Sequence, residues 1–213
     1  MPILAAMLTP DQALAFLAAA VLITLSPGPD NLMVLGLGMS RGRKAGMSFG
    51  LGCALGCLSH TLLAVLGVSA LIAASATAFL LLKIVGGLYL LWLGVQALKG
   101  RGGAPGGGDA APVSLPRLFA KGLFANAINP KVLLFFLAFL PQFVTASRGN
   151  GPAQIAQLGL LFTLQAALLF ASLGYFAGHV GRWLARTPRA GLWLDRTAGC
   201  IFVALGVRLL VVR

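Results

Sequence analysis

The sequence predicts an all-α membrane protein: six transmembrane helices arranged as two inverted three-helix repeats, in a single domain that spans residues 1–213. Three observations predict this class. Of the 213 residues, 59% are hydrophobic and only 9% are charged, whereas soluble domains carry about a quarter charged residues. The apolar residues form continuous runs that are long enough to cross a bilayer. These runs fall into two groups of three, separated by a stretch rich in glycine.

Each predicted span is an apolar run of about 20 residues or more, which is the length that a helix needs to cross a bilayer. No run alternates apolar and polar residues, so the pattern does not fit a transmembrane β-barrel. The first run begins at Asp11 without a basic segment before it, and we interpret it as a retained helix rather than a signal peptide. The six runs lie at about 11–39, 47–73, 78–98, 118–144, 153–180 and 192–212.

Basic residues are concentrated in alternate connections between the predicted spans. The second and fourth connections hold only Arg148, with Lys83 just inside the third span. The first, third and fifth connections hold Arg41, Arg43, Lys44, Lys99, Arg101, Arg117, Lys121, Arg182, Arg186, Arg189 and Arg196. Cytoplasmic loops carry an excess of Lys and Arg, so we expect these three connections to face the cytoplasm and both termini to face out. This pattern accounts for the net charge of +12, and we expect a lipid bilayer rather than nucleic acid as the partner.

The two groups of three runs resemble each other. Residues 82–98, LKIVGGLYLLWLGVQAL, align without gaps with residues 194–210, LDRTAGCIFVALGVRLL, and share Leu, Gly, Leu-Gly-Val and Leu in register. Since each group has an odd number of helices, the second must insert upside down relative to the first. We therefore predict repeats at 1–98 and 118–213, joined by a Gly-rich cytoplasmic linker at 99–117. Inverted repeats are typical of transporters, whose substrate site lies where the two halves meet.

The first predicted span is interrupted by SPGPDN, at residues 26–31. Proline has no N–H to donate, and its ring clashes with the carbonyl group one turn earlier. Pro27 and Pro29 therefore free the carbonyls of Ile23 and Leu25 from helical hydrogen bonding. Free backbone groups at membrane depth are tolerated only inside the protein or beside a water-filled cavity, so we expect this break to face the interior near the midplane.

The fourth predicted span carries a matching break, NAINPK, at residues 126–131. Pro130 frees the carbonyl of Asn126 in the same way, and Gly28 in the first break adds backbone freedom. Prolines also kink membrane helices for packing alone, and this interpretation stays open for either break. Two such motifs in matching spans, each with a neighbouring charge and asparagine, favour a site between the two halves of the chain.

The two breaks hold the most conspicuous charges within the predicted spans, Asp30 and Lys131. A charge at the centre of a bilayer costs about 3 kcal/mol or more, so each needs a partner or water, and we expect the two to approach one another or to flank one cavity. Asn31, Asn126 and Asn129 can both donate and accept hydrogen bonds. Such a site suits a small zwitterion, because a half-helix N-terminus binds a carboxylate, while freed carbonyls and Asp30 bind an ammonium.

Asp30 is also the first candidate to carry a coupling proton, since it is the only carboxylate well inside a span. His60, within the second span, is the second candidate because histidine titrates near neutral pH, although it could equally be a packing residue. Gln165, in the fifth span, could line the cavity or bond a neighbouring helix. We expect no metal and no cofactor. The chain has no glutamate and no nucleophile–base pair at a helical spacing, so we expect it not to be an enzyme.

Several motifs follow in order along the chain: SPGPDN, GRKAG, LSHTLLAVLGVSALI, LLKIVGGLYLLWLGVQALKG and NPKVLLFFLAFLPQFV. In these motifs, over nearly its whole length, the chain resembles the LysE/RhtB family of bacterial amino-acid exporters. The resemblance implies export of amino acids or close derivatives across the bacterial inner membrane, by proton antiport and alternating access. Asp30 stands where many relatives have asparagine. The family's motif positions correspond here to Pro27, Gly28, Pro29, Asn129, Pro130 and Lys131.

Other functions stay open on the residues alone. An exporter of another small metabolite or toxic compound, an importer, or a membrane channel would also need a polar interior. Saturable flux would separate a carrier from a channel. The sequence does not identify the substrate or the coupling stoichiometry. Its Gly-rich helix faces allow close approach of helices, which leaves a homodimer as an open alternative.

Overall fold

The computed structural model describes residues 8–26, 28–68, 75–99 and 114–211. Pro27, predicted to lie in the first break, falls outside these residues. So do most of the predicted Gly-rich linker and the last residues of the second and sixth predicted spans.

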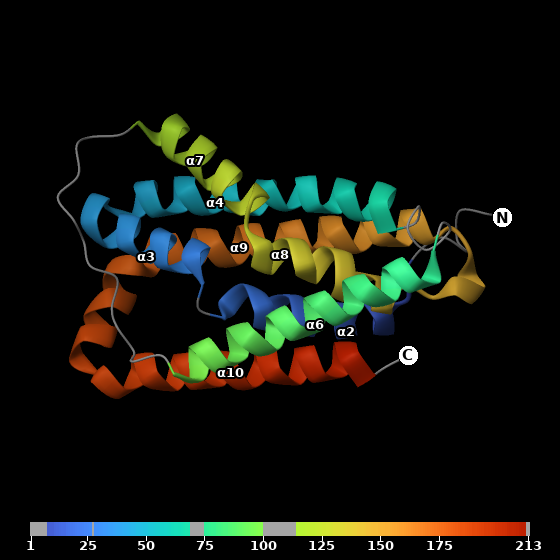
Figure 1. Ribbon diagram of the computed structural model, residues 1–213. Helices are drawn as coiled ribbons and strands as arrows, with labels where there is room; N and C mark the ends of the chain where they lie inside the picture. The colour runs from blue at the N-terminus through green and yellow to red at the C-terminus, as the bar shows by residue number, and fades with distance from the viewer. Residues whose placement is uncertain (1–7, 27, 69–74, 100–113, 212–213) are drawn as a thin grey trace.

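The described residues are helical apart from short connections, which confirms the all-α class. The helices run in both directions along one long axis (Figure 1). Short π-helical or 3-10 segments follow α4 and α8; they are η1 (Ala64–Val68), η2 (Phe135–Phe139), η3 (Leu140–Phe143) and η4 (Ala146–Arg148). The α-helices are α2 (Pro10–Leu25), α3 (Pro29–Arg41), α4 (Arg43–Leu63), α6 (Ala76–Leu98), α7 (Leu115–Ala127), α8 (Pro130–Leu134), α9 (Gly151–Arg186) and α10 (Pro188–Val211).

Up to five candidate membrane spans are present among the described residues. Three are single helices, at Arg43–Gly67, Thr77–Leu98 and Gly151–Leu184. Two more are bent pairs, in which α2 meets α3 at 58° and α7 meets the segment Pro130–Phe143 at 48°. These five correspond to the first five predicted spans. The sixth coincides with α10, which is 24 residues long but is not among these candidates, so it stays a prediction.

The helices α4 and α9 form the centre of the molecule and lie side by side (Figure 1). Helix α7 packs on α4, α3 packs on both central helices, and α2 packs on α9. The remaining pair, α6 and α10, packs together. Both broken spans therefore lie against the two central helices, so the two breaks face the same interior.

Glycines allow the helices to approach closely at these contacts. A Cβ added to Gly46 of α4 would lie 3.1 Å from the Cα of Gly174 on α9. Between α6 and α10, a Cβ on Gly94 would lie 2.9 Å from the carbonyl oxygen of Gly199. One added to Gly206 would lie 2.9 Å from the carbonyl oxygen of Gly87. Small residues are the usual means of close helix packing in membranes.

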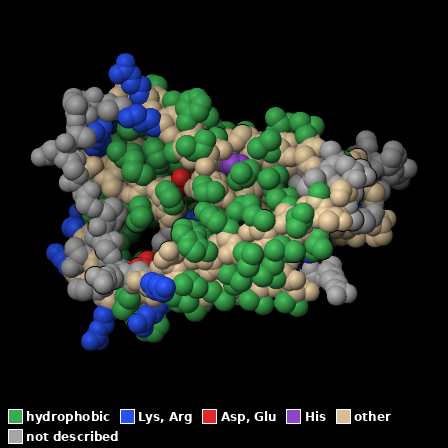
Figure 2. Space-filling model, viewed as in Figure 1, with side chains coloured by type: hydrophobic (Ala, Val, Ile, Leu, Met, Phe, Trp, Pro, Cys, Tyr) green, Lys and Arg blue, Asp and Glu red, His purple; other side chains and the backbone are tan. Residues whose placement is uncertain are grey.

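Lys and Arg side chains gather at one end of the molecule (Figure 2). There α3 and α9 end, and α4 and α7 begin (Figure 1). We call this the basic end, defined by Arg41, Arg43, Lys44, Arg117 and Arg186. The opposite end holds the start of α2, the start of α9 and the end of α10.

Candidate functional site

Both predicted breaks are present where the proline motifs lie. Helix α2 ends at Leu25 and α3 begins at Pro29, while α7 ends at Ala127 and α8 begins at Pro130. Ser26, which caps the end of α2, has an extended backbone. Because an intact helix would have continued through these residues, the breaks leave polar backbone groups inside the protein.

One cavity lies between the two breaks. Its polar lining includes Asp30 and Asn31 from the first break and Asn126 and Lys131 from the second. The cavity has room for about one water molecule. The prediction that Asp30 and Lys131 flank one cavity is confirmed. A molecule larger than water would need the surrounding helices to move apart.

The carboxylate of Asp30 bonds to the opposite break. Asp30 lies at the start of α3 and is only 4% exposed. Its Oδ2 accepts hydrogen bonds from Nδ2 of Asn126 at 2.8 Å and from Nδ2 of Asn129 at 3.0 Å. The two asparagines are three positions apart, so both can reach the same carboxylate. Asp30 therefore ties the first break to the second.

The ammonium of Lys131, from the second break, bonds to the first break. Lys131, in α8, is 7% exposed. Its Nζ donates to the carbonyl oxygens of Ile23 and Ser26, each at 3.2 Å, and to Oγ of Ser26 at 3.3 Å. The carbonyl of Ile23, predicted to be freed by Pro27, thus has a donor. Among the described residues Asp30 and Lys131 make no direct ion pair, because each is engaged by the other half of the chain.

Gly28 gives Lys131 room to reach the first break. A Cβ at Gly28 would lie 2.8 Å from Nζ of Lys131. The φ of Gly28 is −171°, an extended conformation that any residue can adopt. The glycine is therefore required here for the close approach of the ammonium, and not for backbone freedom as the sequence suggested.

His60 bonds to the freed carbonyl of the second break. It is fully buried in α4, and its Nε2 lies 2.9 Å from the carbonyl oxygen of Asn126. Since a carbonyl oxygen only accepts, Nε2 must donate. The ring also packs at 5.8 Å from that of Phe136, and His60 is not among the residues that line the cavity. These contacts favour a role in holding the second break over direct contact with a substrate.

Thr24, at the first break, was not predicted as a site residue. Thr24 of α2 accepts from Nδ2 of Asn31 at its carbonyl oxygen, at 2.8 Å, and from Nε2 of Gln165 at its Oγ1, at 2.9 Å. Gln165, left open by the sequence, thus bonds a neighbouring helix. A threonine within one turn of the proline motif was the available signal, but threonine is also common in membrane helices that bind nothing.

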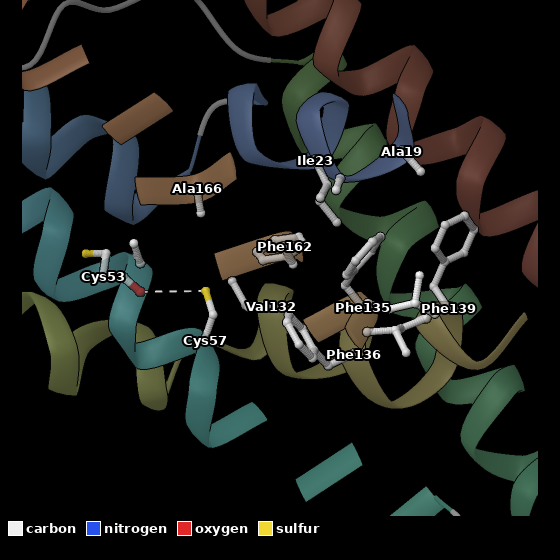
Figure 3. Close-up of a cluster of buried hydrophobic side chains, with 14 of the residues drawn as sticks. Ala19, Ile23, Cys53, Cys57, Val132, Phe135, Phe136, Phe139, Phe162 and Ala166 are labelled. Carbon is white, nitrogen blue, oxygen red and sulfur yellow. Dashed lines mark hydrogen bonds between the residues drawn. The ribbon is translucent and has the colours of Figure 1, made fainter. Parts of the chain in front are cut away.

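Aromatic side chains close the cavity on the side away from the basic end. Phe135 and Phe162 line the cavity, and their rings lie 5.4 Å apart (Figure 3). Phe16 packs on Phe135 at 6.1 Å and on Phe143 at 5.3 Å. We call Phe16, Phe135, Phe136, Phe139, Phe143 and Phe162 the aromatic cluster.

Beyond the aromatic cluster, an amide network joins the start of α2 to the start of α9. Nε2 of Gln12 donates to the carbonyl oxygen of Phe143 at 3.0 Å and to Oγ1 of Thr145 at 2.8 Å. Gln154 of α9 accepts from the backbone N–H of Thr145 at 3.0 Å and donates to its carbonyl oxygen at 3.1 Å. We call Gln12, Phe143, Thr145 and Gln154 the amide network. The end opposite the basic end is thus held by both aromatic packing and hydrogen bonds.

Known proteins similar to this chain include bacterial efflux proteins. The threonine efflux protein of Escherichia coli (strain K12) is 31% identical over 202 residues, which cover 91% of this chain and 94% of that protein. The leucine efflux protein of Enterobacter sp. (strain 638) is 30% identical over 197 residues, covering 91% of this chain and 92% of that protein. The homoserine/homoserine lactone efflux protein of Salmonella typhimurium (strain LT2) is 28% identical over 195 residues, covering 92% and 94%.

No solved structure matches the chain. A family model described as LysE type translocator matches residues 21–213, which include both breaks and the whole cavity lining. This match confirms the resemblance that the motifs indicated. The chain therefore belongs to the LysE type translocator family, and it is a multi-pass membrane transporter rather than an enzyme.

Proposed function

We propose that this protein exports amino acids or close derivatives from the cytoplasm through the cavity between the two breaks. The observation that carries the proposal is the pair of opposite charges, Asp30 and Lys131, buried on either side of one cavity. A zwitterion offers a cation to the one and an anion to the other. The names of the relatives, which concern efflux of threonine, leucine and homoserine, support this substrate class.

We also propose that the chain is built from two inverted repeats of three spans, with α10 as the sixth span. The glycine contacts between α6 and α10 support this arrangement. The gapless alignment matches Gly87 with Gly199 and Gly94 with Gly206. Under this alignment, the contact between Gly87 and Gly206 corresponds to the contact between Gly199 and Gly94. A two-fold axis that relates two inverted halves would produce this correspondence.

In this arrangement the protein lies in a bacterial inner membrane with its basic end toward the cytoplasm. Both termini then lie on the side away from the cytoplasm. The aromatic cluster and the amide network then close the outer side of the cavity. Export by alternating access requires this closure to open while the cytoplasmic side closes. The two breaks are the natural hinges, because their backbone is not held by helical hydrogen bonds.

Asp30 is our first choice for the coupling proton and His60 the second. Protonation would neutralise the acceptor of the Asn126 and Asn129 amides and so weaken the hydrogen bonds that join the two breaks. A proton on Asp30 and a substrate ammonium would compete for the same carboxylate. Such competition is the simplest basis for antiport of protons against an amino acid.

The test is efflux from proteoliposomes that are loaded with threonine, leucine or homoserine and exposed to a pH gradient. We expect saturable efflux that an uncoupler reduces, and the substitution Asp30→Asn should abolish the dependence on the gradient. The control is Asp11→Asn, the same chemical change at an exposed position in the first turn of α2. Gradient-driven efflux by the Asp30→Asn variant would exclude Asp30 as the coupling residue, and non-saturable flux would indicate a channel.

A further inference from the structure

Two buried amide side chains at the first break are oriented by the same residue. Asn31 of α3 and Gln165 of α9 are each 7% exposed. Both donate to Thr24 of α2, Asn31 to its carbonyl oxygen and Gln165 to its hydroxyl. Because a carbonyl oxygen only accepts, the NH₂ group of Asn31 must point toward Thr24. Its Oδ1 therefore points elsewhere.

The acceptor oxygens of these two amides have no partner. Among the described residues, neither Oδ1 of Asn31 nor Oε1 of Gln165 receives a hydrogen bond, although both atoms are buried. Next to Asn31, the carboxylate of Asp30 lines the same cavity and bonds to the second break through Oδ2. Buried acceptors are costly when unpaired. Asn31 lines the cavity, and Gln165 bonds to Thr24, which also lines it.

The ammonium and the two asparagine amides from the second break already bond to the first break. The ammonium of Lys131 bonds to Ile23 and Ser26. The amides of Asn126 and Asn129 bond to Asp30. Around Asp30 and Asn31 the cavity therefore offers a negative charge and an unpaired amide oxygen. A group that fits there carries N–H or O–H donors and a positive charge.

We propose that Asn31, Gln165 and Asp30, with Thr24 holding the two amides in place, form a subsite for the primary ammonium group of the substrate. A primary ammonium has three N–H donors, one for each of these side chains. This inference rests on the proposed function and adds the orientation of the substrate, with its amine at the first break. It also sets a chemical requirement: a free primary amine is recognised, and an N-acylated derivative is rejected.

The test compares three variants, two at Gln165 and one at Gln157, in a counterflow assay with proteoliposomes. Gln165→Met removes the acceptor oxygen but keeps the length of the side chain. Gln165→Glu keeps an acceptor oxygen in the place of Oε1. Its second oxygen replaces Nε2 and can accept a hydrogen bond from the Thr24 hydroxyl. The matched control is Gln157→Met, the same change two turns earlier on α9, where the glutamine accepts from the backbone of Leu8 at the opposite end.

Each protein is assayed with threonine, leucine and homoserine and with their N-acetyl derivatives. For the free amino acids, we expect Gln165→Met to weaken the apparent affinity by about tenfold or more, as for loss of a hydrogen bond to a charged group. Gln165→Glu should weaken it less than Gln165→Met does, and Gln157→Met should stay close to wild type. The N-acetyl derivatives should not compete in the wild-type protein. Size-exclusion profiles and thermal unfolding identify a variant that fails to fold, and Gln165→Glu still tests the acceptor in that case.

The outcomes separate the two proposals. Equal affinity of wild type and Gln165→Met, or competition by N-acetyl derivatives in wild type, would overturn the ammonium subsite while export itself stood. That result would assign the unpaired oxygens to a resident water or metal cation. If the wild-type protein moves none of the free amino acids, the proposed function fails and the subsite fails with it.

Discussion

At the scale of single residues, the two buried charges each stabilise the break to which they do not belong. Asp30 begins α3 but holds the asparagines of the second break. Lys131 lies at the start of α8, in the second half of the fourth span, but donates hydrogen bonds to carbonyls of the first break. A carbonyl left by an interrupted helix is costly in a membrane. Each charge therefore lowers the cost of the interruption opposite to it.

Replacement of Lys131 by methionine should disrupt the first break. The change keeps the length and the apolar stem but removes the ammonium that donates to the carbonyls of Ile23 and Ser26, so that Ile23 keeps only the hydroxyl of Ser26 as a side-chain donor. We expect a loss of about 2 kcal/mol in unfolding free energy and a loss of efflux, measured by thermal unfolding in detergent and by transport in proteoliposomes. Lys121→Met, at an exposed position of α7, is the control. A Lys131→Met protein with wild-type melting temperature would contradict this role.

A methyl group at Gly28 should displace the same ammonium. In Gly28→Ala the new Cβ would lie 2.8 Å from Nζ of Lys131, and overpacking of this kind costs about 1–3 kcal/mol. The backbone of Gly28 is extended, so the effect is steric. We expect lowered melting temperature and efflux. Gly67→Ala, where a Cβ meets nothing within 4 Å, should behave like wild type, and equal behaviour of the two variants would argue against the steric explanation.

At the scale of elements, the second break is held from α4 by His60. Its Nε2 donates to the carbonyl of Asn126, which lies opposite Pro130. The side chain of Asn129 caps the start of α8 by accepting a hydrogen bond from the backbone N–H of Lys131. The break is therefore supported by a neighbouring helix as well as by its own sequence. This arrangement fixes where the fourth span bends.

Substitutions of His60 can separate a positioning role from proton relay. Glutamine offers an N–H near the position of Nε2, whereas leucine offers none. We expect His60→Gln to retain most gradient-driven efflux and His60→Leu to lose it together with thermal stability. His179→Leu, at an exposed site on α9, controls for the loss of an imidazole. Loss of coupling in His60→Gln at wild-type stability would instead point to proton transfer through the ring.

The proline motifs predicted these elements well, because the effect of proline on a helix is local. The two breaks, the shared cavity and the burial of Asp30, Asn126 and Lys131 all follow from residues 26–31 and 126–131. The pairing of each charge with the opposite break did not follow. It depends on side-chain geometry between segments about a hundred positions apart, which a single sequence does not contain. The anchoring of Asn31 and Gln165 by Thr24 was missed for the same reason.

At the scale of the whole molecule, closure is unequal between the two ends. The aromatic cluster and the amide network lie between the cavity and the end opposite the basic one. On the face in view, the surface is hollowed toward the basic end (Figure 2). In the proposed orientation, export requires these contacts to separate, so their strength sets how readily the outer side of the cavity opens.

Loss of the amide network should therefore expose the cavity from outside. Gln12→Leu removes the donor to Phe143 and Thr145. In a C53S/C200S background Cys57, which lines the cavity, is the only cysteine. We expect an impermeant thiol reagent added outside intact cells to label it several-fold faster in Gln12→Leu. Gln96→Leu, exposed on α6, is the control. Unchanged labelling would show that this network does not limit opening.

The reciprocal glycine contacts between α6 and α10 carry a consequence for how such a chain can be assembled. Gly87 contacts Gly206 and Gly94 contacts Gly199, so α6 and α10 pack together through corresponding glycines. A joint of this type needs no covalent tether. Two separate polypeptides, cut between Lys99 and Ser114 and synthesised in the same cell, should find each other in the bilayer and restore export.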